Sequence, residues 1–88
     1  MQGSLVKWNS SGYYGFLKPK DSFDIYVHVK SLRQSNIRDV RIGDVFEFVT
    51  MPGKDGRPVA YDLSCIAKGP GEYFNLRDQV LAARRMTR

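Results

Sequence analysis

The sequence contains few of the residues on which enzymes and metal sites depend. Among its 88 residues there is one cysteine, Cys65, and one histidine, His28. A lone cysteine excludes an intramolecular disulfide and a cysteine-cluster zinc site, and it favours a reducing, intracellular environment. A lone histidine has no partners with which to hold a metal ion. We therefore expect no metal and no other cofactor.

Catalytic patterns are also missing. The histidine and the cysteine lie 37 positions apart, so nothing in the sequence places a general base beside a nucleophile. The glycine-containing loop at residues 53–56 lacks the lysine followed by serine or threonine that ends a phosphate-binding P-loop. We expect a binding protein rather than an enzyme.

Long apolar runs are absent as well. The N-terminus has no apolar signal segment, and no run approaches the roughly 20 residues that a membrane-spanning helix needs. These features predict a complete, cytoplasmic chain that makes no contact with a membrane.

What the sequence does have is an excess of positive charge. The formal net charge is +5, which favours a polyanionic partner such as nucleic acid. Residues 1–67 hold nine Lys and Arg against seven Asp and Glu, a net charge of +2, whereas residues 68–88 hold five against two, a net charge of +3. The last quarter of the chain therefore carries more than half of the excess.

Two short segments have the alternation of β-strands, namely GYYGFLKP at residues 12–19 and DIYVHV at residues 24–29. Successive side chains of a strand point to opposite faces, so Tyr14, Phe16 and Lys18 share one face of the first segment. Tyr26 and His28 share one face of the second segment. The opposite faces carry Gly15, Leu17, Ile25, Val27 and Val29. A small barrel has one interior, so we expect the aliphatic faces to fill it and the aromatic faces to be exposed, where rings can stack on unpaired bases.

At these residues the sequence resembles the cold-shock domain family, whose two RNA-binding motifs have the general forms KGFGFI and VFVHF. The matching segments are residues 12–17 and 25–29, and the flanking matches are VKW at 6–8, IGDVFEF at 42–48 and PGKDGRP at 52–58. The resemblance covers residues 3–66. It implies an all-β fold, a five-stranded antiparallel OB-fold barrel, and binding of single-stranded RNA or single-stranded DNA. A role as an RNA chaperone follows from the same resemblance.

The face pattern and the resemblance together identify candidate nucleic-acid-binding residues. They are Lys7, Trp8, Tyr13, Tyr14, Phe16, Lys18, Phe23, Tyr26, His28, Lys30, Lys54 and Arg57. We expect the ring of Trp8 to be exposed and to stack on a base, although a core position is the alternative. Each cation is read either as a phosphate contact or as an ordinary solvated charge.

The sequence also departs from the family at positions that carry rings and cations. Asn9 follows Trp8 where the family has phenylalanine, and Gly12-Tyr13 stands where the family has lysine and glycine. Val29 replaces a further aromatic residue. Tyr13 and Phe23 are the residues that can compensate, so we expect weaker or narrower binding than in a typical member.

The remaining barrel elements follow from composition. We expect strands at residues 4–9, 13–18, 24–29, 45–50 and 59–66, and one turn of helix within residues 30–41. Phe46 and Phe48 are predicted core residues. Strict alternation in the last strand puts Val59, Tyr61, Leu63 and Cys65 on one side.

The Gly69-Pro70-Gly71 segment predicts the end of the barrel, which divides the chain into a domain at residues 1–67 and an extension at 68–88. Asn75 is a good helix N-cap, and residues 72–88 are predicted to form a short C-terminal helix. That helix would bury Leu76, Val80 and Leu81 on its own barrel or on a second copy. The alternative function is a protein-interaction module or a homo-oligomerising module in which the C-terminal extension is the main functional element, and the extension would then be the contact of a homodimer.

Overall fold

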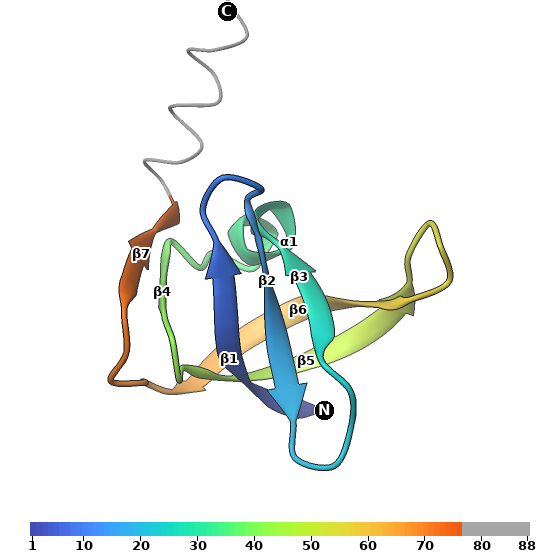
Figure 1. The fold of residues 1–88 in the computed structure, drawn as a ribbon, viewed down its shortest axis with the longest axis horizontal. Coiled ribbons are helices and arrows are strands. Elements are labelled where there is room, and N and C mark those ends of the chain that lie inside the picture. The colour runs from blue at the N-terminus through green and yellow to red at the C-terminus, as the bar shows by residue number, and fades with distance from the viewer. Residues whose placement is uncertain (77–88) are drawn as a thin grey trace, which may run out of the picture.

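The computed structural model describes residues 1–76, and within them five strands close into a barrel in the order β1-β2-β3-β6-β5 (Figure 1). A short sheet of β4 and β7 lies beside it. The elements are β1 (Gln2–Asn9), β2 (Tyr14–Pro19), β3 (Ile25–His28), α1 (Val29–Gln34), β4 (Asp39–Arg41), β5 (Val45–Pro52), β6 (Pro58–Ala67) and β7 (Tyr73–Asn75). The predicted all-β barrel is confirmed.

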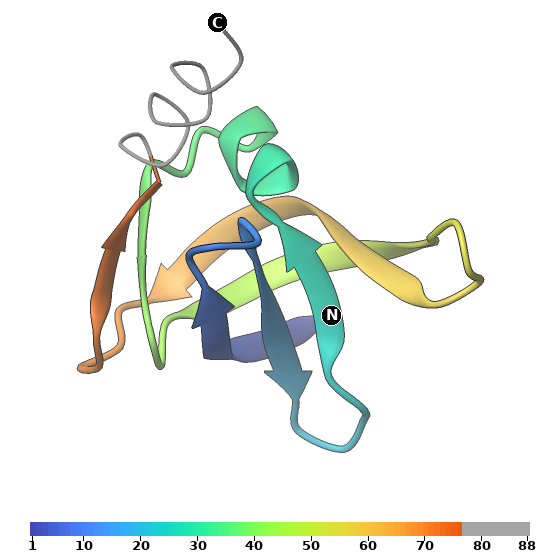
Figure 2. The same ribbon diagram turned by 45° about the horizontal axis from the view of Figure 1, so that its top comes forward.

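The strand order explains how the barrel closes. Every neighbouring pair is antiparallel except β3 and β6, which run parallel with Tyr26 opposite Val59. The sequence predicted a barrel that is antiparallel throughout, and the parallel pair of β3 and β6 corrects that prediction. The tip of the β5–β6 hairpin projects beyond the barrel (Figure 2). No helix described within residues 1–76 is long and apolar enough to cross a membrane.

A bulge in β1 decides which of its side chains enter the core. Leu5 lies opposite Leu17 and Lys7 opposite Phe16, so Val6 is an extra residue in the ladder. An extra residue reverses the alternation beyond it. Leu5 and Trp8 consequently both point inward, with 1% and 7% of their surfaces exposed, and Lys7 points outward.

The inward face of β2 needs a glycine opposite Trp8. Gly15 is buried and pairs with Trp8, and the indole packs directly over it. A Cβ atom at Gly15 would lie 2.6 Å from Cε3 of Trp8 and closer still to the carbonyl oxygen of Lys7. Any larger residue would therefore displace the tryptophan or the β1 backbone.

A second bulge lies in β6 and corrects the predicted faces of that strand. Glu47 pairs with Ser64 and Val49 with Tyr61, so Asp62 and Leu63 together oppose one residue of β5. Asp62 has a φ of +51°. Leu63 is buried while Tyr61 remains partly exposed, so these two side chains do not share a face.

The Gly69-Pro70-Gly71 segment does not lead away from the barrel. The backbone N–H groups of Gly69 and Arg41 donate to the two carboxylate oxygens of Asp44, at 2.6 and 2.8 Å, and Asp44 is 1% exposed. A Cβ atom at Gly69 would collide with the backbone of Gly43 and Asp44. Glycine is needed here for close backbone approach.

The residues after this segment correct the start of the predicted helix. Tyr73–Asn75 form β7, which pairs with β4 and places Phe74 opposite Val40. Leu76, the residue after the predicted N-cap Asn75, is helical and fully buried in the core, so strand pairing outweighs helix propensity at residues 73–75 and not at Leu76. Val80 and Leu81 of the predicted helix lie outside the described residues.

We predict that Leu76→Ala lowers the free energy of unfolding by about 2–5 kcal/mol, because it removes a fully buried leucine side chain. Urea unfolding of the full chain measures this loss. Ile66→Ala is the control, since Ile66 is 50% exposed and its truncation should change stability by no more than about 0.5 kcal/mol. Equal effects of the two substitutions would show that residues 68–76 add nothing to the core.

Candidate nucleic-acid interface

The outer face of β2 and β3 carries four rings in contact with one another, which we call the platform: Tyr14, Phe16, Tyr26 and His28. Tyr14 pairs with His28 and Phe16 with Tyr26 across the two strands. The rings of Tyr14 and Tyr26 stack with centroids 5.5 Å apart, and Phe16 meets Tyr26 edge to face at 6.1 Å. His28 lies 6.4 Å from Tyr26. All four are half-buried, so their shared face assignment from the sequence is confirmed.

Positive charge borders the platform on the β1 side. Lys7 lies opposite Phe16 because of the β1 bulge, and Lys18 is exposed two residues after Phe16 on the same face of β2. Asn9 donates from Nδ2 to the hydroxyl of Tyr14 at 3.1 Å. The edge therefore has both cations and a hydrogen bond that orients a platform ring.

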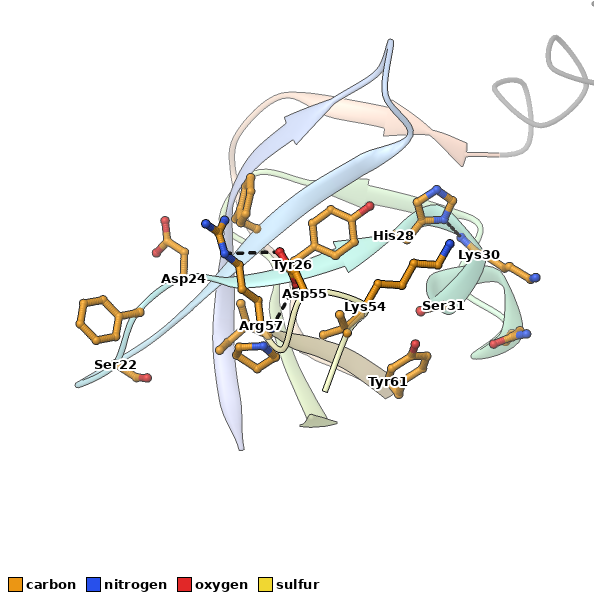
Figure 3. A pocket seen from close by; sticks show the side chains of 17 residues that line it. Ser22, Asp24, Tyr26, His28, Lys30, Ser31, Lys54, Asp55, Arg57 and Tyr61 are labelled. Carbon is orange, nitrogen blue, oxygen red and sulfur yellow. Dashed lines mark hydrogen bonds and ion pairs between the residues drawn. The ribbon is translucent and has the colours of Figure 1, made fainter. Parts of the chain in front are cut away.

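A groove of about 1180 Å³ lies on the other side of the platform, between β3, α1 and the β5–β6 hairpin. Phe16, Tyr26 and His28 form part of its lining. Three cations, Lys30, Lys54 and Arg57, also line it, and Figure 3 shows Lys54 extending from the hairpin toward His28 and Lys30. Rings thus lie beside positive charge, an arrangement that suits a chain of bases joined by phosphates.

Two further groups line the groove. Asp55 holds Arg57 in two ways. The backbone N–H of Arg57 donates to Oδ1 of Asp55 at 3.1 Å, and Nε of Arg57 lies 3.5 Å from Oδ2. Phe23 is 91% exposed in the loop before β3 and lines the groove. The hairpin cation is therefore oriented, and an apolar ring is presented to solvent nearby.

His28 has a structural role as well as a place on the platform. It is the N-cap of α1, and its Nδ1 accepts the backbone N–H of Lys30 at 3.1 Å. Burial, and then the charge of Lys30, lower the pKa of His28 below its ordinary value of 6.5. The imidazole is therefore neutral at pH 7, with its proton on Nε2. Burial and the neighbouring Tyr14 raise the pKa of Tyr26, so that its hydroxyl stays protonated.

Two of the predicted nucleic-acid-binding residues, Trp8 and Tyr13, lie neither on the platform nor in the groove. The prediction that the ring of Trp8 is exposed is wrong, because the β1 bulge turns it into the core against Gly15. With 7% of its surface exposed, it has no face to offer a base. Its buried Nε1 has no hydrogen-bond partner within residues 1–76.

Tyr13 is the second predicted site residue that does not join the platform. It lies in the turn before β2 rather than in the strand, and its φ of +59° is one that glycine adopts without strain. Its side chain is half-buried against the core, and its carbonyl oxygen accepts the N–H of Val29 at 2.8 Å. Tyr13 therefore packs beside the core instead of adding a ring to the platform.

The sequence analysis missed several residues that line the groove. They are Ser22, Asp24, Ser31, Gln34, Val59 and Tyr61, with Asp55 and Gly53 from the hairpin. Strict alternation grouped Tyr61 with Leu63 and hid its exposure. The signal that could have revealed the exposure of Tyr61 was its neighbour Ala60. Neighbouring side chains of a strand point to opposite faces, so a small apolar residue that points inward places Tyr61 on the outer face.

Within the described residues, no group of three or more His, Cys, Asp or Glu side chains is arranged to hold a metal ion. The rings and cations around the groove are the features of the site, and they are those of a nucleic-acid-binding surface.

Comparison with known proteins agrees with this class. The family model described as the 'Cold-shock' DNA-binding domain matches residues 1–66. The chain belongs to this family, a family of nucleic-acid-binding domains rather than enzymes.

Individual relatives show how much of each protein the chain represents. It is 35% identical over 66 residues to cold shock protein 1 of Arabidopsis thaliana, covering 73% of this chain but 22% of that protein. It is 30% identical over 56 residues to the major cold shock protein CspA of Pseudomonas aeruginosa, covering 62% of this chain and 81% of that protein. Glycine-rich protein 2 of Nicotiana sylvestris is 36% identical over 61 residues, with 67% and 28% covered. β7 and Leu76 lie beyond the family match.

We predict that His28 makes the stability of the barrel depend on pH. Its pKa is lowered in the folded state, so on acidification the unfolded chain binds the proton first. The stabilising contribution of neutral His28 to the free energy of unfolding is complete above the ordinary pKa of 6.5. It is lost as the pH falls from 6.5 through the pKa of His28 in the folded state. Urea unfolding at several pH values between about 7.5 and 5 measures it.

The control variant is His28→Asn, which keeps an N-cap acceptor and removes the titrating group. The natural chain should lose stability relative to this variant as the pH falls. If the two stability profiles remain parallel over that range, His28 does not couple folding to protonation.

Proposed function

We propose that this protein binds single-stranded RNA or DNA by stacking unpaired bases on the platform while the cations around it neutralise the phosphates. The observation that carries the proposal is the contact of Tyr14, Phe16, Tyr26 and His28 on one outer face. A core aromatic cluster would stabilise the barrel, but these rings lie outside a core that is already filled. Cytoplasmic action is part of the proposal, consistent with a single free cysteine.

The energetics suit a protein that holds strands unpaired. Each base stacked on an aromatic side chain contributes about 1–3 kcal/mol, and each base-pair step of a duplex about 1.4 kcal/mol. Several stacks can therefore compete with a short hairpin, whereas a long duplex is too stable. The protein would trap strands that open spontaneously, which is the action of an RNA chaperone without an energy source.

We predict that Phe16→Ala and Tyr26→Ala each weaken single-strand binding by about 1–3 kcal/mol while the barrel stays folded, because each removes one stacking ring. Anisotropy of a labelled oligonucleotide is the measurement, since buried Trp8 is a poor reporter of stacking. Tyr73→Ala is the control, a 47% exposed aromatic residue on β7, away from the platform. Loss of folding before any loss of affinity would place the two rings in the core instead.

We predict a modest dependence of binding on salt. Each phosphate neutralised on a single strand contributes a slope of about −0.7, and the surface has these cations: Lys7, Lys18, Lys30, Lys54 and Arg57. The slope of log K against log salt should therefore be no steeper than about −3.5. Lys54→Ala should reduce it by about 0.7, whereas Phe16→Ala should leave it unchanged. A slope that corresponds to about eight phosphates would contradict binding dominated by stacking.

The second candidate, an interaction or homodimerising module built on the C-terminal extension, has less support. Leu76 is fully buried within its own chain, so it does not present an apolar surface to a partner. Light scattering of the full chain separates the candidates, because dimerisation independent of oligonucleotide would favour the module.

A further inference from the structure

The groove continues past the platform to Tyr61, which none of the family motifs contains. The bulge at Asp62 leaves Ala60 and Leu63 buried, so Tyr61 points outward with Val59. Both line the groove together with Tyr26 and His28. The outer face of β6 is therefore an extension of the platform.

The parallel pairing of β3 and β6 places Val59 beside the platform. Tyr26 lies opposite Val59, and two residues further along each strand come His28 and Tyr61. Side chains two apart in a strand share a face, and neighbouring strands are about 4.8 Å apart. Tyr61 therefore shares the outer face of β6 with Val59 and lines the same groove as Tyr26 and His28.

Helix α1 forms the wall beside Tyr61. The hydroxyl of Ser35 accepts the N–H of Leu63 at 3.0 Å and donates to the carbonyl oxygen of Ser31 at 3.0 Å. This pair of hydrogen bonds fixes the end of α1 against β6. Ser31 and Gln34 therefore line the same groove as Tyr61.

Both sides of the platform carry cations, with Lys7 and Lys18 on the β1 side, but the two sides differ in the rings that they expose. On the β1 side Trp8 is buried, and the side chain of Asn9 is bonded to Tyr14. On the β6 side Lys30 and Lys54 line the groove that leads to Tyr61 (Figure 3). A strand that leaves the platform toward β6 meets both a ring and cations.

From these contacts we infer that Tyr61 is a further base-stacking residue, and that a bound single strand runs from the platform through the groove between α1 and the β5–β6 hairpin. This inference rests on the proposed function and adds a path and a residue to it. A base on Tyr61 would lie beside the exposed Gln34, whose amide suits hydrogen bonds to a base edge.

The path predicts that Tyr61 matters for long strands alone. Homopolymers of about three and about eight nucleotides are compared, because the short strand occupies the platform and the long one reaches Tyr61. Tyr61→Ala should weaken binding of the long strand by roughly 5- to 150-fold and leave the short strand unchanged. Tyr61→Phe keeps the ring and should bind both strands as the natural chain does.

Val49→Ala is the matched control, since Val49 is the cross-strand neighbour of Tyr61 and is 50% exposed. It should change neither affinity. The inference would be overturned if Tyr61→Ala bound both the short and the long strand as tightly as the natural chain does. If Tyr26→Ala still bound them more weakly, the proposed function would stand. A natural chain that binds neither strand would overturn the proposed function itself.

Two other results would also overturn the inference. Equal weakening of both strands by Tyr61→Ala, together with lower stability in urea, would make Tyr61 a structural residue. Weak long-strand binding by Tyr61→Phe would show that the hydroxyl, and not the face of the ring, makes the contact.

Discussion

The in-register pairing of β2 with β3 is the constraint on which the rest of the structure depends. Because Phe16 lies opposite Tyr26 and Leu17 opposite Ile25, one face of this pair is wholly aliphatic and the other is aromatic. The aliphatic face fills the only interior that a small barrel has. A shift of the register by one residue would turn the rings inward and expose the aliphatic side chains, so core and platform are formed by the same set of backbone hydrogen bonds.

Two single-residue bulges then determine how far the aromatic surface extends. The bulge at Val6 turns Trp8 into the core and brings Lys7 beside Phe16. The bulge at Asp62 keeps Tyr61 outside while Leu63 is buried. The first removes a ring from the β1 side, and the second leaves one on the β6 side. Both effects favour the groove beside α1 as the continuation of the proposed binding surface.

Asp44 connects the barrel to the residues that follow the family match. A buried carboxylate is costly unless it is well hydrogen-bonded, and here each of its oxygens accepts a backbone N–H group. One of these comes from Gly69, whose lack of a side chain permits the close approach. The chain is thereby directed along β4, where β7 pairs and Leu76 completes the core. Residues 68–76 are thus packed as part of the structured unit.

By itself the sequence determined the barrel class, the inward residues of β2 and β3, and the four rings of the platform. These features depend on the alternation of side chains between the two faces of a strand, and a repeat of two residues can be recognised in the sequence alone. The positions of Trp8, Tyr61 and β7 were decided by the tertiary structure alone. A bulge forms where two strands from distant parts of the chain must stay paired around a closing barrel, and β7 forms because Val40 and the core offer burial to Phe74 and Leu76. Such long-range pairing and burial override the local pattern at Trp8, Tyr61 and residues 73–75, whereas Leu76 is helical as the sequence predicts.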